Sequence, residues 1–185
     1  MIDELIQDAI RRMDKSVDAT HEHFNTLRTG RAAAALLDRI TVDYYGTATP
    51  LKQLASINVP EPRMLTVQPF DPSTIKSIEK AVMESDLGLT PSNDGKMIRL
   101  PIPQLTEERR KDLVKLARQM AEEGRVSVRN VRRDLMHHLK ELVVNGDVGD
   151  DEERRAEDRA QKLTDEHVQR IDEMLKRKEA EIMEV

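Results

Sequence analysis

Apolar side chains recur at steps of three and four residues in three stretches of the chain, which is the spacing of a buried helix face. The first stretch, residues 2–28, is predicted to form a helix that stops at Gly30. The second begins after Thr106, a favoured N-cap residue, and runs to about Val144. The third begins near Asp150. Three amphipathic stripes of similar length are expected to pack as a three-helix bundle.

Between the first two helices the pattern changes to that of short strands. Apolar residues and turn signals predict strands at residues 40–44, 57–59, 65–67 and 97–102, with a turn at 46–50. Asp71 and Pro72 can cap and begin a helix that ends near Gly88. This middle segment is therefore predicted to be a small, β-rich α+β domain.

The predicted fold is α+β with two domains. Residues 1–29 and 106–185 form the elongated three-helix bundle, and residues 31–104 form the domain inserted between its first and second helices. We expect hinges near 29–31 and 102–106, where glycine and proline interrupt regular structure.

Basic side chains gather on one side of the second long helix. At 100° of rotation per residue, eight of them fall within an arc of about 100°, roughly opposite the apolar row, with Glu122 as the only acid. They are Lys111, Lys115, Arg118, Arg125, Arg129, Arg132, Arg133 and Lys140. Such a row can be a solvated helix face. Like charges this close disfavour an isolated helix, however, so we interpret the row as a contact for a polyanion.

The identity of these basic residues favours folded RNA over a membrane surface. Arginine dominates the middle of the row, and a guanidinium can fork onto a phosphate group. The helix offers no aromatic platform for stacking bases, so binding is expected to follow backbone shape more than base sequence.

Charge and composition agree with this interpretation. The net charge is −5, yet residues 106–146 carry 10 basic and 7 acidic groups. Aromatic residues make up only 2% of the chain, which suits long helices better than a thick globular core. The acidic N-terminus and the lack of a long apolar run predict a cytoplasmic protein with no membrane partner.

Catalytic and metal chemistry find little support in the sequence. The chain has no cysteine, and the histidine pairs His21 with His23 and His137 with His138 lack the spacing of a helical zinc site. Lys96 follows a glycine but belongs to no phosphate-binding loop. We therefore expect no enzyme activity, no cofactor and no metal, with any nucleotide energy coming from a partner.

Several short motifs resemble those of the bacterial ribosome recycling factor family, over essentially the whole chain. They are LRTGR at 27–31, DYYG at 43–46, SDLGL at 85–89, LTEERRKD at 105–112, VRNVRRD at 128–134 and QKLTD at 161–165. The resemblance implies an L-shaped, monomeric molecule that binds large-subunit ribosomal RNA. It also implies that the protein works with elongation factor G and GTP to split the post-termination ribosome, releasing mRNA and tRNA.

The resemblance also assigns residues. It implies that Arg129 and Arg132, with Arg133 beside them, contact RNA. It places the hinges at Arg28, Thr29, Gly30, Arg31, Pro103, Gln104, Leu105 and Thr106. Residues 32–35 are all alanine where many relatives have a proline at the third position, which bears on hinge stiffness. The competing hypothesis is a helical adaptor that binds only proteins, which would not need the basic row.

Overall fold

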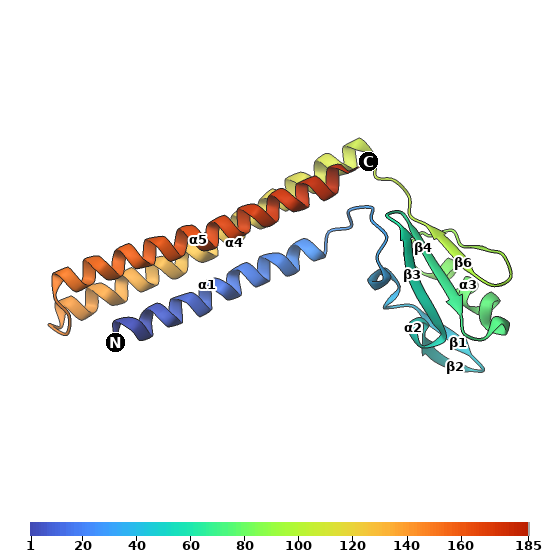
Figure 1. Cartoon of the computed structure of the whole chain (residues 1–185), viewed down its shortest axis with the longest axis horizontal. Helices are drawn as coiled ribbons and strands as arrows, with labels where there is room; N and C mark the ends of the chain where they lie inside the picture. Colours follow the sequence, from blue (N-terminus) through green and yellow to red (C-terminus); the bar gives the residue numbers. More distant parts are fainter. Residues whose placement is uncertain (185) are drawn as a thin grey trace. The chain divides into compact units, whose positions relative to one another are not determined.

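Three long helices form one of the two compact units of the chain. The computed structural model describes residues 1–184, in which α1 spans Ile2–Asn25, α4 spans Glu107–Val144 and α5 spans Asp150–Met183. Each of these helices packs against the other two (Figure 1). With 38 residues, α4 is about 57 Å long at 1.5 Å per residue. The prediction of an elongated three-helix bundle is confirmed.

The bundle is held together by the apolar rows that the sequence pattern indicated. Side chains from all three helices are fully or almost fully buried: Ile6, Met13 and Phe24 from α1, Leu113, Val128 and Leu139 from α4, and Ala160 and Ile171 from α5. Burying side chains of this size stabilises each helix by roughly 1.5–3 kcal/mol per residue. Packing of these rows, more than the helix propensity of isolated segments, therefore maintains the long helices.

Small residues let α1 approach α4 closely near the middle of the bundle. A Cβ atom placed on Gly124 would lie 2.2 Å from Oγ1 of Thr20 and 3.1 Å from Cδ1 of Ile171. Thr20 is buried, and its hydroxyl donates to the Ser16 carbonyl at 2.9 Å. Only glycine fits at position 124 with this packing.

A polar cluster joins α1 to α5 in the same unit. Nε2 of the buried His167 lies 2.9 Å from Oδ1 of Asp14, and Arg170 donates to the same oxygen at 2.8 Å. The hydrogen bond from Arg170, assisted by His167, lowers the pKa of the Asp14 carboxyl below its ordinary value despite partial burial. The two helices therefore share a polar link beside their apolar contact.

Two helices end earlier than predicted, and one of them, the helix of the second unit, stops at Glu84 instead of near Gly88. Helix α1 ends at Asn25, five residues before Gly30, because Thr26 closes the last turn. The Thr26 hydroxyl and backbone N–H both donate to the His23 carbonyl. At the other end of the bundle Gly146, with φ +78°, ends α4 as the sequence indicated.

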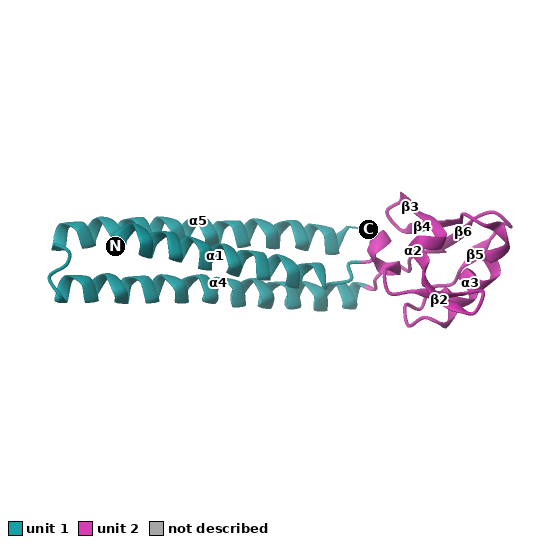
Figure 2. Ribbon diagram, turned by 90° about the horizontal axis from the view of Figure 1, so that it is seen from below, with its two compact units in different colours: residues 1–29, 107–185 teal, residues 30–106 magenta. Residues whose placement is uncertain are grey.

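The second compact unit, residues 30–106, contains the strands (Figure 2). A two-stranded antiparallel hairpin pairs β1 (Thr41–Tyr44) with β2 (Thr47–Pro50). A four-stranded antiparallel sheet has the order β3-β4-β6-β5. Its strands are β3 (Ala55–Glu61), β4 (Met64–Pro69), β6 (Ile98–Pro101) and β5 (Ser92–Asn93). The short helix α2 (Leu51–Leu54) joins β2 to β3.

Helix α3 (Ile75–Glu84) covers the core of this unit. Ile78 and Val82 of α3 pack with Leu65 and Val67 of β4 in a single apolar cluster. Asp71 accepts the Ser73 backbone N–H and caps a 3-10 turn that precedes α3, close to where the sequence predicted a helix start. The prediction of a small β-rich α+β unit is confirmed.

Two strands were not predicted: β2 was read as a turn, and the two-residue β5 was not expected. Residues 46–50 were expected to be a turn, but residues 47–50 form β2 and only Tyr45 and Gly46 connect it to β1. Both connecting residues have positive φ, 49° and 83°, as a two-residue hairpin requires. Thr47, Ala48 and Thr49 include no large apolar side chain that would have indicated a strand.

Gly124→Ala is expected to destabilise the bundle by about 1–3 kcal/mol, because overpacking against Thr20 outweighs the better helix propensity of alanine. Urea unfolding followed by circular dichroism measures the change. In a Thr20→Ala background the same substitution should cost clearly less, since the nearest clashing atom is gone. Equal costs in the two backgrounds would contradict the proposed clash.

Candidate nucleic-acid interface

All eight basic residues singled out from the sequence lie on α4. Six of them are exposed, while Arg125 and Arg132 are half-buried. The structure divides the set into two groups according to the partners of each side chain.

The first group, which we name the seam row, is Arg118, Arg125 and Arg132. These arginines follow each other at steps of seven residues and all reach α5. Arg118 donates to Glu179 at 2.6 Å and Arg125 to Asp172 at 2.7 Å. Because α4 and α5 are antiparallel, partners on α5 recur seven residues apart in the opposite direction. The third arginine instead donates to the neutral amide of Gln161, at 2.8 Å.

The second group, which we name the outer row, is Lys111, Lys115, Arg129, Arg133 and Lys140. All five are exposed. Two of them pair with acids of their own helix: Lys111 with Glu107 at 3.0 Å, and Arg129 with Glu122 at 3.2 Å. Arg133 donates to the side chain of Asn130. Within residues 1–184, Lys115 and Lys140 make no ion pair.

Two details of the predicted basic row are corrected. The seam row does not lie opposite the apolar row: the Arg125 side chain is only 19% exposed and lies at the contact between α4 and α5. A second acid, Glu107, adjoins the row and pairs with Lys111. A helical wheel treats α4 in isolation, so it could not show that α5 covers one edge of the basic arc.

Carboxylates and arginines stabilise each other's charged forms along the seam. The hydrogen bond from Arg125, with a further one from Arg129, lowers the pKa of the Glu122 carboxyl. The hydrogen bond to Glu179 raises the pKa of Arg118 above its ordinary value. Burial alone would lower the pKa of Arg125, but Asp172 and Glu122 outweigh it. Arg118 and Arg125 therefore stay charged while their charge is partly compensated within the protein.

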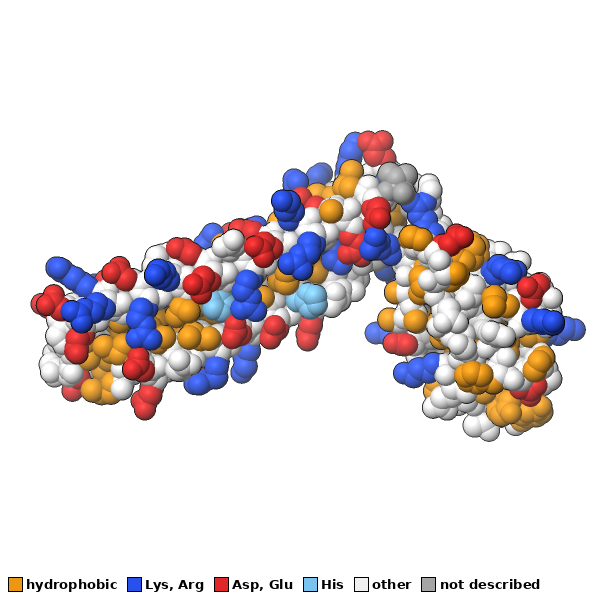
Figure 3. All heavy atoms as spheres, viewed as in Figure 1, with side chains coloured by type: hydrophobic (Ala, Val, Ile, Leu, Met, Phe, Trp, Pro, Cys, Tyr) orange, Lys and Arg blue, Asp and Glu red, His pale blue; other side chains and the backbone are white. Residues whose placement is uncertain are grey.

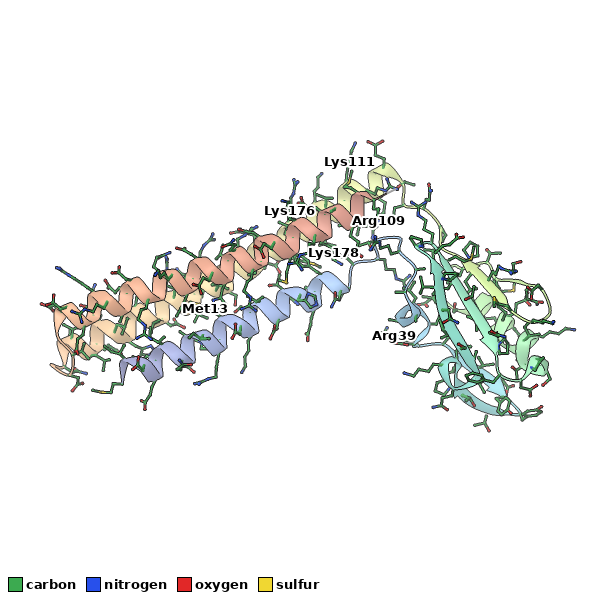
Figure 4. The ribbon with its side chains drawn as sticks, in the orientation of Figure 1. Met13, Arg39, Arg109, Lys111, Lys176 and Lys178 are labelled. Atoms are coloured by element: carbon green, nitrogen blue, oxygen red, sulfur yellow. The ribbon has the colours of Figure 1, made fainter. Side chains whose placement is uncertain are left out.

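Charges on the bundle are not uniformly basic. On the face shown in Figure 3, acidic and basic side chains are interleaved along the helices. Lys111 projects from the start of α4, and Lys176 and Lys178 lie on the adjacent end of α5 (Figure 4). Lys178 is itself paired with Glu181 at 3.0 Å. The outer row of α4 is therefore the candidate for a basic contact surface on this unit.

The residues predicted as hinges occupy the ends of the two units. The chain passes from the bundle to the second unit between Thr29 and Gly30, and it returns between Thr106 and Glu107. The Thr29 hydroxyl donates to Glu181 at 2.9 Å within the bundle. Gly30 has φ +78°, and a Cβ there would lie 3.2 Å from Cγ of Leu105 in the same unit. Arg28, Arg31, Pro103 and Gln104 adjoin these boundaries.

No other type of site emerges from the part of the chain that the structure describes. Among residues 1–184, no group of three histidine or acidic side chains could hold a metal ion. In the same residues, no helix combines the length and the apolar character needed to cross a membrane. The basic face of α4 is therefore the strongest candidate site.

Comparison with known proteins decides the family. The sequence model of ribosome recycling factor matches residues 20–183. The chain belongs to the ribosome recycling factor family. The ribosome-recycling factor of Rubrobacter xylanophilus is 60% identical over 180 residues, covering 97% of each chain. That of Geobacillus thermodenitrificans is 55% identical over 185 residues, covering 100% of each chain.

Solved structures of the ribosome recycling factor family share the fold. A solution structure of ribosome recycling factor is 41% identical with a TM-score of 0.72, covering 100% of this chain and 98% of that one. A second structure, of the Thermus thermophilus factor, is 46% identical with a TM-score of 0.63 over 100% of both chains. It was built together with Escherichia coli elongation factor G bound to the Escherichia coli post-termination complex.

The two rows are expected to respond differently to alanine substitution. Arg125→Ala should lower the free energy of unfolding by about 1–2 kcal/mol, because it removes half-buried contacts to Asp172 and Glu122. Lys115→Ala should change it by less than about 0.5 kcal/mol. Urea denaturation of both variants measures the difference. If both variants were equally stable, Arg125 would not be a link between α4 and α5.

Proposed function

We propose that the chain recycles ribosomes: it binds the post-termination ribosome through α4 and, with elongation factor G and GTP, separates the subunits to release mRNA and tRNA. Membership of the ribosome recycling factor family supports this role. The structure of a relative built on a post-termination complex with elongation factor G supports the two partners. The protein would act as a monomer in the cytoplasm.

The surface that would contact ribosomal RNA is the outer row of α4 together with Arg132. The exposed groups of this row can neutralise phosphates and release bound counterions. Arg129 and Arg133 offer forked donors to phosphate oxygens, whereas Lys115 and Lys140 act as point charges. The single observation that carries the proposal is that the outer row remains exposed while Arg118 and Arg125 are paired with carboxylates of α5. Arg132 is half-buried but has a neutral partner on α5.

Replacing both Arg129 and Arg132 by glutamate is expected to abolish binding to purified large ribosomal subunits without unfolding the bundle. A single loss, Arg129→Ala, should reduce the slope of log affinity against log salt by about 0.7–0.9. The matched control is Arg11→Glu with Arg177→Glu, which makes the same charge change at side chains that are 67% and 80% exposed on α1 and α5. Equal loss of binding in the control would show that only total charge matters.

The protein is proposed to have no catalytic activity of its own, so GTP hydrolysis during recycling would belong to elongation factor G. Purified protein should therefore release no phosphate from GTP, while the complete mixture with post-termination ribosomes should split subunits. Phosphate release and light scattering measure the two events. GTP turnover that co-purifies with the protein and persists without elongation factor G would contradict this assignment.

We also propose that the chain bends at its two connections, near residues 28–31 and 103–106, during splitting. Gly30→Ala should disturb this bending, since alanine disfavours φ +78° by roughly 1–2 kcal/mol and its Cβ would crowd Leu105. The expected result is near-normal ribosome binding with slower splitting. Unchanged splitting by the folded variant would argue against a hinge at this residue.

A further inference from the structure

The arginines of the seam row pair with carboxylates of α5 at two positions but not at the third, Arg132. Arg118 and Arg125 each meet a carboxylate directly, Glu179 and Asp172 respectively. Stepping seven residues along each helix in opposite directions pairs Arg132 with Asp165. No direct ion pair between these two side chains is found among residues 1–184. Gln161, one turn earlier on α5, lies between them.

The glutamine amide is held in one orientation. Its carbonyl oxygen accepts from Nη1 of Arg132 at 2.8 Å, and its NH2 group donates to Oδ1 of Asp165 at 2.8 Å. A flipped amide would set NH2 against the guanidinium and oxygen against the carboxylate, so only this orientation satisfies both neighbours. The chain Arg132, Gln161, Asp165 is therefore directional, with each group donating to the next.

This arrangement determines which hydrogen-bond donors and how much charge Arg132 has available for a phosphate group. Arg118 and Arg125 form ion pairs with carboxylates of α5, whereas Arg132 is held by a hydrogen bond to a neutral amide. A guanidinium has five N–H donors, and the hydrogen bond to Gln161 uses one of them. The remaining donors and the full positive charge stay available for a phosphate group, on a side chain whose orientation is already restricted.

We propose that Gln161 is a positioning residue for RNA binding: its neutral amide orients Arg132 toward the RNA backbone and separates it from Asp165. This inference rests on the proposed RNA-binding role of α4. It adds a residue from α5, outside the basic row, to the determinants of affinity. It also explains why an acidic helix can lie beside the RNA-binding helix without neutralising its central arginine.

The test is Gln161→Glu, which keeps size and geometry but gives Arg132 a carboxylate partner like those of Arg118 and Arg125. Binding of the full-length protein to purified large ribosomal subunits is measured over a range of salt concentrations. Affinity should fall about tenfold, as expected for one charge-assisted contact, and the salt slope should fall by about 0.7–0.9. The urea midpoint should change little, since the variant gains an ion pair with Arg132 but loses the hydrogen bond from Gln161 to Asp165.

The matched control is Gln169→Glu, on the same helix. Gln169 makes the same i,i+4 hydrogen bond to a carboxylate, that of Glu173, but its described hydrogen bonding does not reach α4. This variant should change affinity by less than about twofold with an unaltered salt slope. Equal effects of Gln161→Glu and Gln169→Glu would overturn the positioning role, because the added negative charge alone would then explain the loss of affinity.

An Arg132→Ala background separates failure of this inference from failure of the proposed function. In that background Gln161→Glu should have no more effect than Gln169→Glu, because the side chain being positioned is absent. If Arg132→Ala itself leaves binding unchanged, the RNA-binding role of Arg132 fails and the inference fails with it. If Arg132→Ala weakens binding but Gln161→Glu does not, the inference alone is wrong.

Discussion

The antiparallel register of α4 against α5 is the constraint on which the rest of the bundle depends. Burial of Leu113, Val128 and Leu139 on one helix and Ile171 on the other fixes that register. Once it is fixed, polar residues at the edge of the contact must meet at steps of seven, which sets Arg118 beside Glu179 and Arg125 beside Asp172. Helix packing therefore determines which cations of α4 are used internally and which remain outside.

The distribution of charge follows from the same packing. Residues 147–185 carry 8 basic and 14 acidic groups, so α5 as a whole repels a polyanion. Its acids at the seam are partly compensated by α4, and α4 keeps exposed cations on its far side. A net charge of −5 is thus compatible with RNA binding, because one face is basic and the remaining surface discourages binding in other orientations.

The long periodic segments could be predicted from the sequence because the apolar spacing of a helix persists over many turns. The bounds of α4 and α5 follow from Thr106, Gly146 and Asp150, which are strong local signals. Strand β2 was missed because Thr47–Pro50 contains no large apolar side chain, and its partner β1 lies across a two-residue turn with Tyr45 in an unusual conformation. Pairing with a neighbouring strand determines such a strand, and the local sequence pattern carries no information about that pairing.

The eight basic residues predicted as a candidate site all lie on α4, but their division into two rows could not be foreseen. A helical wheel gives the direction of Arg125 and Arg132 but contains no neighbouring helix. The proposed role of Gln161 could not be predicted, because the sequence spacing indicates Asp165 as the partner of Arg132. Once α4 and α5 are taken as antiparallel, the seven-residue spacing of Asp165, Asp172 and Glu179 matches that of the three seam arginines.

We propose that ribosomal RNA contacts α4 at Arg133 and Lys140 of the outer row and at the adjacent seam-row residue Arg132. The chain has no cysteine, so a single cysteine can carry an iron chelate that cleaves nearby RNA through hydroxyl radicals. Met136→Cys places the probe one turn from these residues, and Asp18→Cys places it at an exposed position on α1. On bound large subunits, we predict strong, localised ribosomal RNA cleavage from position 136 and much weaker cleavage from position 18. Stronger cleavage from position 18 than from position 136 would contradict the account.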